Sequence, residues 1–224
     1  MGYYIDLSEI KVEDYSKILK SADLLPSRRI LKENLESNFE LLKQNGVRNL
    51  ESLLKQLKTK STIEDFAKES GIEENFLTVL VREVKSYKQK PNKLRDFPET
   101  PAVVIKKLED RGVKNTWKLY DLVLTSDQRI QLSKDLKIDP KEIHRLARLT
   151  DLSRVRWVNH TFAYVLYEAG YQTAKELAKA NYENLYEEVK QLNKERAIYK
   201  GNIGLHDMKL CVEAAKDLPF EIEV

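Results

Sequence analysis

The stretch from residue 144 to residue 160 is the part of the sequence best suited to bind a negatively charged polymer. It gathers histidines, arginines and a tryptophan: His144, Arg145, Arg148, Arg154, Arg156, Trp157 and His160. Arg145 and Arg148 are three positions apart, which places them on one face of a helix. A tryptophan beside arginines can stack on an unpaired base or anchor a protein partner. The alternative is that Trp157 is a core residue and that the arginines pair with nearby carboxylates.

A second run of positive charge lies between residues 85 and 95, where the sequence has no acidic residue. Its members are Lys85, Lys88, Lys90, Lys93 and Arg95. Together with Tyr87 they could follow a phosphate backbone, and the competing interpretation is a solvated linker. Local clusters of this kind matter here because 39 basic and 36 acidic residues leave a net charge of only +3. Any surface for nucleic acid must therefore come from clustering and not from an overall excess of charge.

The sequence contains no group of residues with the spacing of a catalytic or metal centre. The three histidines, His144, His160 and His206, lack the cysteine or carboxylate spacing of a zinc site. There is also no Ser–His–Asp arrangement, glycine-rich phosphate loop or HExxH motif. We therefore expect a protein that binds without catalysis and needs neither a metal nor a cofactor.

Three sequence features indicate the cellular setting: the cysteine content, the first residues and the length of the apolar stretches. A single cysteine, Cys211, allows no internal disulfide, and its amphipathic surroundings predict a small buried side chain. The first residues lack the pattern of a signal peptide, and no apolar stretch approaches the roughly 20 residues of a membrane span. We expect a cytoplasmic protein with no membrane partner.

Helices must position these side chains, because the sequence is poor in strand and turn signals. It has seven glycines and six prolines, and Leu, Lys and Glu recur at helical spacing. We expect an all-α fold of at least eight helices with no sheet. Three segments share one pattern around Gly46, Gly112 and Gly170, in which a leucine stands four positions before the glycine and another stands seven after it.

This pattern has a mechanical explanation. A glycine just past a helix end adopts a left-handed conformation at little cost and stops the helix. The next residue then packs on the leucine before the turn, which predicts the pairs Leu42–Val47, Leu108–Val113 and Leu166–Tyr171. Two residues further on stand Asn49, Asn115 and Thr173, which are good helix N-caps. Each segment therefore predicts a helical hairpin with positive φ at its glycine.

The hairpins recur along the chain as tandem repeats. Gly46 and Gly112 are 66 residues apart. Five further pairs keep this offset: Thr59 and Thr125, Phe66 and Leu132, Ile72 and Ile138, Leu77 and Ile143, and Leu80 and Leu146. A constant offset without gaps indicates a duplicated unit. We divide the chain into an N-terminal helical extension (1–38), a first repeat (39–92), a second repeat (93–152) and a third, degenerate repeat with a closing helix (153–224).

The segment from Val155 through Ala163 to Gly170, preceded by Asp151-Leu152-Ser153-Arg154, resembles a helix-hairpin-helix unit. With its neighbours it is similar to a bacterial domain-of-unknown-function family of tandem helix-hairpin-helix or SAM-like units, over roughly residues 39–218. The resemblance implies hairpins packed in an array and assigns no activity. In DNA-binding hairpins two glycines let backbone amides approach a phosphate. Here those positions are Trp157 and Asn159.

The absence of glycine at positions 157 and 159 changes the kind of contact that we expect with nucleic acid. Without the glycines we expect side-chain contacts, from Arg145, Arg148, Arg154 and Arg156 with stacking on Trp157, and residues 88–95 as a second arm. This favours single-stranded nucleic acid or RNA over duplex. The alternative is a protein-interaction scaffold or self-association module that binds no nucleic acid.

Overall fold

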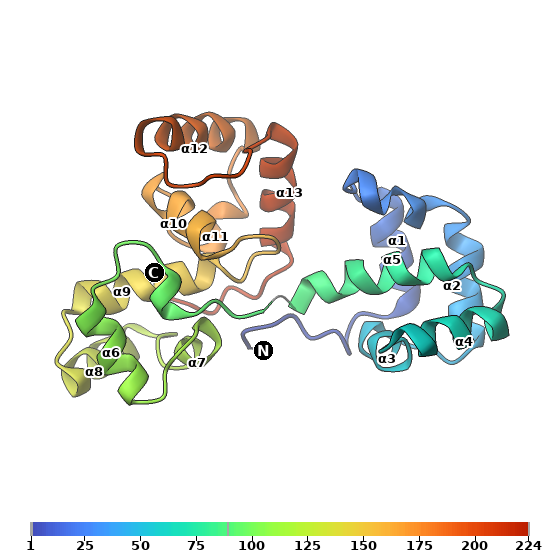
Figure 1. Cartoon of the computed structure of the whole chain (residues 1–224), viewed down its shortest axis with the longest axis horizontal. Coiled ribbons are helices and arrows are strands. Elements are labelled where there is room, and N and C mark those ends of the chain that lie inside the picture. The colour runs from blue at the N-terminus through green and yellow to red at the C-terminus, as the bar shows by residue number, and fades with distance from the viewer. Residues whose placement is uncertain (1, 89, 224) are drawn as a thin grey trace. The chain divides into compact units, whose positions relative to one another are not determined.

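The computed structural model describes residues 2–88 and 90–223, and these residues form an all-helical protein (Figure 1). They contain thirteen α-helices and three 3-10 helices. The extended pairing found among them is limited to two isolated bridges, Lys11 with Asn49 and Lys93 with Asn115. The expected all-α class, with at least eight helices and no sheet, is therefore confirmed for the described residues. No helix in this part of the chain is long and apolar enough to cross a membrane.

The chain folds as two compact units. The N-terminal unit is Asp6–Lys88, and the C-terminal unit consists of residues 2–5 together with residues 90–223. The four-segment division of the sequence does not follow this boundary, because segment 1–38 includes residues of both units and segment 39–92 extends past Lys88. That division stays a prediction about repeats.

The N-terminal unit packs short helices around an aromatic core. Its elements are α1 (Val12–Ser21), η1 (Pro26–Lys32), α2 (Leu35–Gln44), α3 (Leu50–Gln56), α4 (Lys60–Ser70), α5 (Glu74–Lys85) and η2 (Ser86–Lys88). Phe39 of α2 lies between Tyr15 and Phe76, with ring centroids 6.3 Å and 6.5 Å away. A buried ion pair of 3.0 Å joins Arg28 of η1 to Glu83 of α5. These contacts hold α1, α2 and η1 against the long helix α5.

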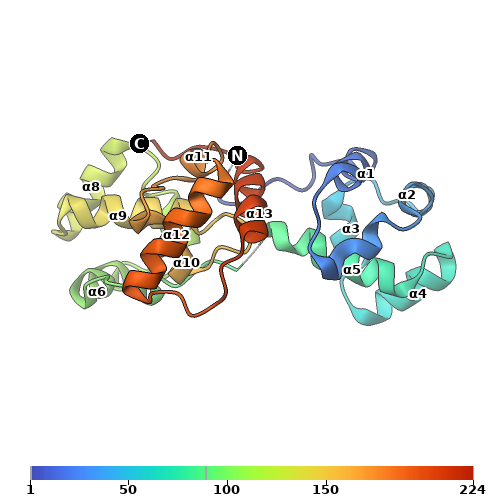
Figure 2. The same ribbon diagram turned by 90° about the horizontal axis from the view of Figure 1, so that it is seen from above.

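The C-terminal unit is arranged around α9. Its elements are η3 (Leu94–Asp96), α6 (Ala102–Asp110), α7 (Thr116–Tyr120), α8 (Ser126–Leu136), α9 (Pro140–Leu152), α10 (His160–Glu168), α11 (Ala174–Leu177), α12 (Tyr182–Arg196) and α13 (Leu205–Lys216). Helix α9 packs against α7, α8 and α10. Helix α13 packs against α11 and α12 (Figure 2). One face of α9 buries Ile143, Leu146 and Leu149 completely. The opposite edge of the same helix is left for polar side chains.

The three glycine turns have the predicted geometry. Gly46, Gly112 and Gly170 have φ values of 81°, 83° and 100°. Around the first, the amide of Val47 donates to the carbonyl of Leu42 at 3.0 Å and that of Gly46 to Lys43 at 3.0 Å. The same two bonds recur at Gly112 and Gly170. This paired bonding satisfies carbonyls that a helix end leaves open, and it requires the left-handed residue.

The helix starts also follow the sequence signals. The side chains of Asn49, Asn115 and Thr173 cap α3, α7 and α11 by accepting from the amide three residues on. Helices α4 and α8 begin and end 66 residues apart, at Lys60–Ser70 and Ser126–Leu136. Helices α6 and α10 do so 58 residues apart, at Ala102–Asp110 and His160–Glu168.

Two glutamates expected in capping boxes have other partners. Asp139 caps α9 through the amide of Lys141 at 2.9 Å, but the Glu142 carboxylate accepts from Arg145 instead of returning to the cap. Glu176 accepts from the amide of Gln172, one residue before the expected cap amide of Thr173. Neither glutamate therefore forms the capping box that its position three residues after the N-cap would allow.

Candidate functional site

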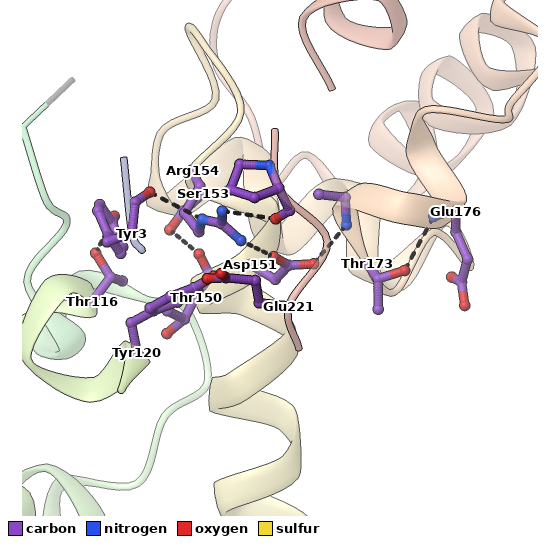
Figure 3. Close-up of polar contacts among 12 residues, drawn as sticks. Tyr3, Thr116, Tyr120, Thr150, Asp151, Ser153, Arg154, Thr173, Glu176 and Glu221 are labelled. Atoms are coloured by element: carbon purple, nitrogen blue, oxygen red, sulfur yellow. Dashed lines mark hydrogen bonds and ion pairs between the residues drawn. The ribbon is translucent and has the colours of Figure 1, made fainter. Parts of the chain in front are cut away.

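Arg154 lies inside the C-terminal unit and is not part of its surface. Its side chain has no exposed area. The guanidinium donates to the Asp151 carboxylate at 2.7 Å, to the Tyr3 carbonyl at 3.1 Å and to the Pro219 carbonyl at 3.0 Å (Figure 3). It also lies 4.5 Å from the ring centre of Tyr120. The expectation that Arg154 contacts nucleic acid therefore fails, because every edge of its guanidinium is used within the protein.

Asp151 extends this buried cluster toward α11. Its second carboxylate oxygen accepts from the Ala174 amide at 2.8 Å, at the start of that helix. Burial raises the pKa of the Asp151 carboxyl, while Arg154 and the Ala174 amide oppose that shift. Nearby, Tyr3 shares a hydrogen bond of 2.7 Å with Thr116 of α7. The cluster joins residues 2–5, α7, α9, α11 and the C-terminal segment, and its contacts are those of a structural clamp.

Arg156 and Trp157 follow α9 in the chain and differ in their solvent exposure. Arg156 is 8% exposed, and its guanidinium lies 4.3 Å from the ring centre of Trp157. Trp157 itself is 42% exposed, so its interpretation as a core residue is wrong. Its φ of 67° is the left-handed conformation that a glycine would adopt easily. The turn before α10 therefore has a left-handed residue at position 157, and that residue is a large aromatic one.

The amides at the start of α10 are not available to a phosphate. The His160 amide donates to the side-chain oxygen of Asn92 at 3.1 Å, and the Phe162 amide donates to that of Asn159 at 2.9 Å. Two of the donors that would form an anion nest are therefore satisfied by side chains of the protein. This agrees with the absence of glycine at positions 157 and 159.

A shallow depression of about 410 Å³ lies along the polar edge of α9. Its lining comes from α9 and α10: Pro140, Lys141, His144, Arg145, Arg148 and Tyr167. The four α9 side chains that can carry positive charge stand at helical intervals of three and four, so they form one stripe. Of this lining, His144, Arg145 and Arg148 were predicted from the sequence, and Lys141 and Tyr167 were not. The same spacing extended by one turn would have found Lys141.

Arg145 is fixed in this stripe by the neighbouring hairpin. Its guanidinium donates to the carbonyls of Pro98 and Glu99 at 3.3 Å and 3.0 Å, and to the Thr100 hydroxyl at 3.0 Å. It also forms an ion pair of 3.3 Å with Glu142. Arg145 is therefore an anchored cation whose charge is partly balanced.

The remaining charges of the stripe lack such partners. Within residues 2–88 and 90–223, no carboxylate lies within ion-pair distance of Lys141 or Arg148. Partial burial, with the nearby Arg129 and Arg148, lowers the pKa of His144. A neutral imidazole flanked by uncompensated cations is the electrostatic setting in which an incoming anion is stabilised. This cationic depression is the candidate site.

The run from Lys85 to Arg95 is divided between the two units. Lys85 and Lys88 belong to the N-terminal unit, where Lys88 lies 3.9 Å from Glu51. Lys90, Lys93 and Arg95 belong to the C-terminal unit, where Arg95 pairs with Glu109 at 2.6 Å. Lys90 and Lys93 are exposed. Two of the expected contacts are therefore balanced by carboxylates.

No group of three or more potential metal ligands occurs in the described part of the chain. Cys211 is buried, and burial raises the pKa of its thiol to about 12, as a packed small side chain requires.

Fold and site together define an all-helical protein with a cationic depression on one helix. The chain belongs to the family described as Domain of unknown function (DUF4332), whose model matches residues 98–218. That match lies within the C-terminal unit and is shorter than the resemblance over residues 39–218 suggested by the sequence patterns. The search of curated proteins and the search of solved structures found no match.

Proposed function

We propose that the protein binds the phosphate backbone of single-stranded nucleic acid through the cationic depression of α9, without catalysing a reaction. The observation that carries this proposal is the stripe of Lys141, His144, Arg145 and Arg148, in which Lys141 and Arg148 form no ion pair in the described structure. A cation with no carboxylate partner does not have to break an ion pair before it contacts a phosphate. Each such contact also releases condensed counterions from the nucleic acid, which favours binding.

The preference for a single strand follows from the hydrogen-bond donors that the protein leaves available to a phosphate. Because Asn92 and Asn159 occupy two of the amides at the start of α10, we expect the contacts to come mainly from side chains. A shallow groove with an adjacent tyrosine, Tyr167, suits a flexible strand that can adapt its backbone and stack a base. Three cationic contacts would give a log–log salt slope of about −2 on a single strand, so binding is expected to be weak at physiological salt.

The test is fluorescence anisotropy with labelled single-stranded and duplex oligonucleotides at low salt. The double variant Lys141→Gln/Arg148→Gln should lose most of the affinity and flatten the slope by about 1.4. The matched control is Lys175→Gln/Lys179→Gln, which removes the same charge from exposed positions on or beside α11, outside the depression. Equal binding by the parent and the α9 variant would refute this proposal.

A protein-interaction scaffold is the second candidate, favoured by the exposed aromatic residues of the C-terminal unit. Trp157 and Trp117 are 42% and 45% exposed, and tryptophan is enriched at the centres of protein interfaces. Self-association measured by analytical ultracentrifugation should then weaken in Trp157→Ala and depend little on salt. A parent protein that remains monomeric at high concentration would count against the self-association form of this candidate.

We also propose that the scaffold consists of tandem helix-hairpin-helix-like units. The support is the matched bounds of α4 with α8 and of α6 with α10, and the repeated bonding at the three glycine turns. An experimental structure in which residues 35–85 and 101–151 failed to superpose would contradict the duplication.

A further inference from the structure

We infer that the N-terminal unit carries a second, separate phosphate-binding site beside the Gly46 turn. This inference deepens the proposed function, because it gives the same chain a second contact for the phosphodiester groups of a nucleic-acid strand. The site is a depression of about 550 Å³. Its lining comprises Ser8, Lys11, Glu13, Lys43, Gly46, Val47, Arg48 and Asn49.

Three cations line this depression, and each is placed by a different part of the local structure. Lys43 stands in the last turn of α2, and Arg48 follows the Gly46 turn. Lys11 is brought beside them by its bridge to Asn49. That bridge includes hydrogen bonds of 3.1 Å from Val12 to the Arg48 carbonyl and 3.0 Å from Leu50 to the Ile10 carbonyl. The cluster is therefore held by the backbone of two segments far apart in the sequence.

The charges of this cluster are uncompensated. Lys11, Lys43 and Arg48 form no ion pair among the described residues, and Glu13 supplies the carboxylate in the lining. Three positive charges and one negative charge leave the lining with a formal charge of +2. The cations of the lining outnumber its one carboxylate, and a phosphate group would balance the excess positive charge.

Backbone amides and the Asn49 side chain are not part of the ligand set. The amides of Arg48 and Asn49 both donate to the Ser52 hydroxyl at 3.0 Å. The Asn49 side chain donates to the Ser8 carbonyl at 2.9 Å and accepts from the Ser52 amide at 2.8 Å. Recognition must come from the three cationic side chains, which suits a phosphate oxygen and gives no selection among bases.

The corresponding turn in the C-terminal unit shows what satisfies such a cluster. The residue 66 positions after Lys43 is Glu109, and its carboxylate holds Arg95 at 2.6 Å next to the Gly112 turn. There the protein supplies its own anion. In the N-terminal unit Lys43 stands at that position and Glu13 stands at the position of Arg95. No ion pair joins these two side chains among the described residues, so the charge of Lys43 remains available to a ligand.

The open turn also leaves room for the approach of a strand. Gly46 is exposed, and a Cβ built on it would meet no atom within 4 Å. The immediate neighbourhood of the Gly46 Cα is therefore free of side chains.

The test uses the full chain and a labelled single-stranded oligonucleotide at low salt. Lys43→Gln/Arg48→Gln should flatten the salt slope by about 1.4, the value expected for two lost contacts. Lys58→Gln/Lys68→Gln is the matched control, since both lysines are exposed in the same unit and outside the depression. Glu13→Gln should strengthen binding, because it removes the competing carboxylate. Binding by Lys43→Gln/Arg48→Gln that equals the parent overturns the inference.

A second readout separates this site from the one on α9. Inorganic phosphate titrated into isotope-labelled protein should shift the amide signals of Gly46 and Arg48, and these shifts should persist in Lys141→Gln/Arg148→Gln. If phosphate shifts the Gly46 signal while Lys141→Gln/Arg148→Gln binds the oligonucleotide as well as the parent, this site is retained. The proposed function at α9 is then refuted. Absence of these shifts, with intact binding at α9, would refute this site alone.

Discussion

Arg154→Ala should destabilise the C-terminal unit strongly, because the substitution leaves several buried groups without partners. Asp151 would remain a carboxylate with 4% of its side chain exposed and no cation beside it. Removing one partner of a buried ion pair costs about 3–5 kcal/mol. The carbonyls of Tyr3 and Pro219 would each lose a donor. We expect a loss of about 4 kcal/mol, a large part of the roughly 5–15 kcal/mol by which domains are stable.

The two tryptophans make this loss easy to measure in the C-terminal unit. The sequence has only Trp117 and Trp157, and both belong to that unit. Urea unfolding followed by tryptophan fluorescence therefore reports on it without a signal from residues 6–88. The control is Arg148→Ala, which should change the free energy of unfolding by less than about 0.5 kcal/mol because Arg148 is partly exposed and forms no ion pair in the described structure.

A double variant tests the cause of the loss. Asp151→Leu/Arg154→Met replaces both charges with apolar side chains and should recover much of the stability, since such replacements are often neutral. If Arg154→Ala costs less than about 1 kcal/mol, or weakens nucleic-acid binding while leaving stability unchanged, the guanidinium is a surface ligand and this account of the clamp is wrong.

Three other perturbations test separate features. Gly112→Ala should cost about 1 kcal/mol in urea unfolding, because φ is 83° while a Cβ meets no atom; an unchanged midpoint would show that the turn tolerates a side chain. Burial and the neighbouring arginines lower the pKa of His144 below its ordinary 6.5, so protonation disfavours the folded state and His144 should reduce stability as the pH falls below about 6.5. NMR titration should find that phosphate raises this pKa, and no change would argue against an anion beside the imidazole. Cys211, whose pKa is raised to about 12 by burial, should react with a thiol reagent only after unfolding, and rapid labelling of the native protein would contradict its packing.

The parts of the fold that depend on neighbouring residues could be predicted from the sequence. A glycine four positions after a leucine, followed by an N-cap, determines a turn through hydrogen bonds within about ten residues. Those bonds are present at Gly46, Gly112 and Gly170. The stripe on α9 is local in the same sense, because helical spacing alone brings Arg145 and Arg148 together.

Arg154 could not be placed in this way. Its partners are the carbonyls of Tyr3 and Pro219, which lie 151 and 65 residues away in the sequence. Nothing in the pattern around Arg154 distinguishes an arginine that closes a core from one that faces solvent. Its burial depends on the meeting of the N-terminal residues, α9 and the C-terminal segment, which is a property of the tertiary fold.

The turn before α10 depends both on local sequence and on contacts between distant residues. Trp157 keeps a left-handed φ of 67°, and Glu99, 58 residues earlier, has a φ of 56°. A residue with a Cβ pays about 1–2 kcal/mol for this conformation, so other contacts must hold the backbone. At Glu99 they include the hydrogen bonds from Arg145 to the carbonyls of Pro98 and Glu99. An arginine from α9 thus maintains the hairpin where glycine is absent, while its neighbour Arg148 remains without an ion pair in the described structure. The left-handed backbone at Trp157 and Glu99 therefore persists without glycine, and the proposed anion site rests on the cationic side chains of α9.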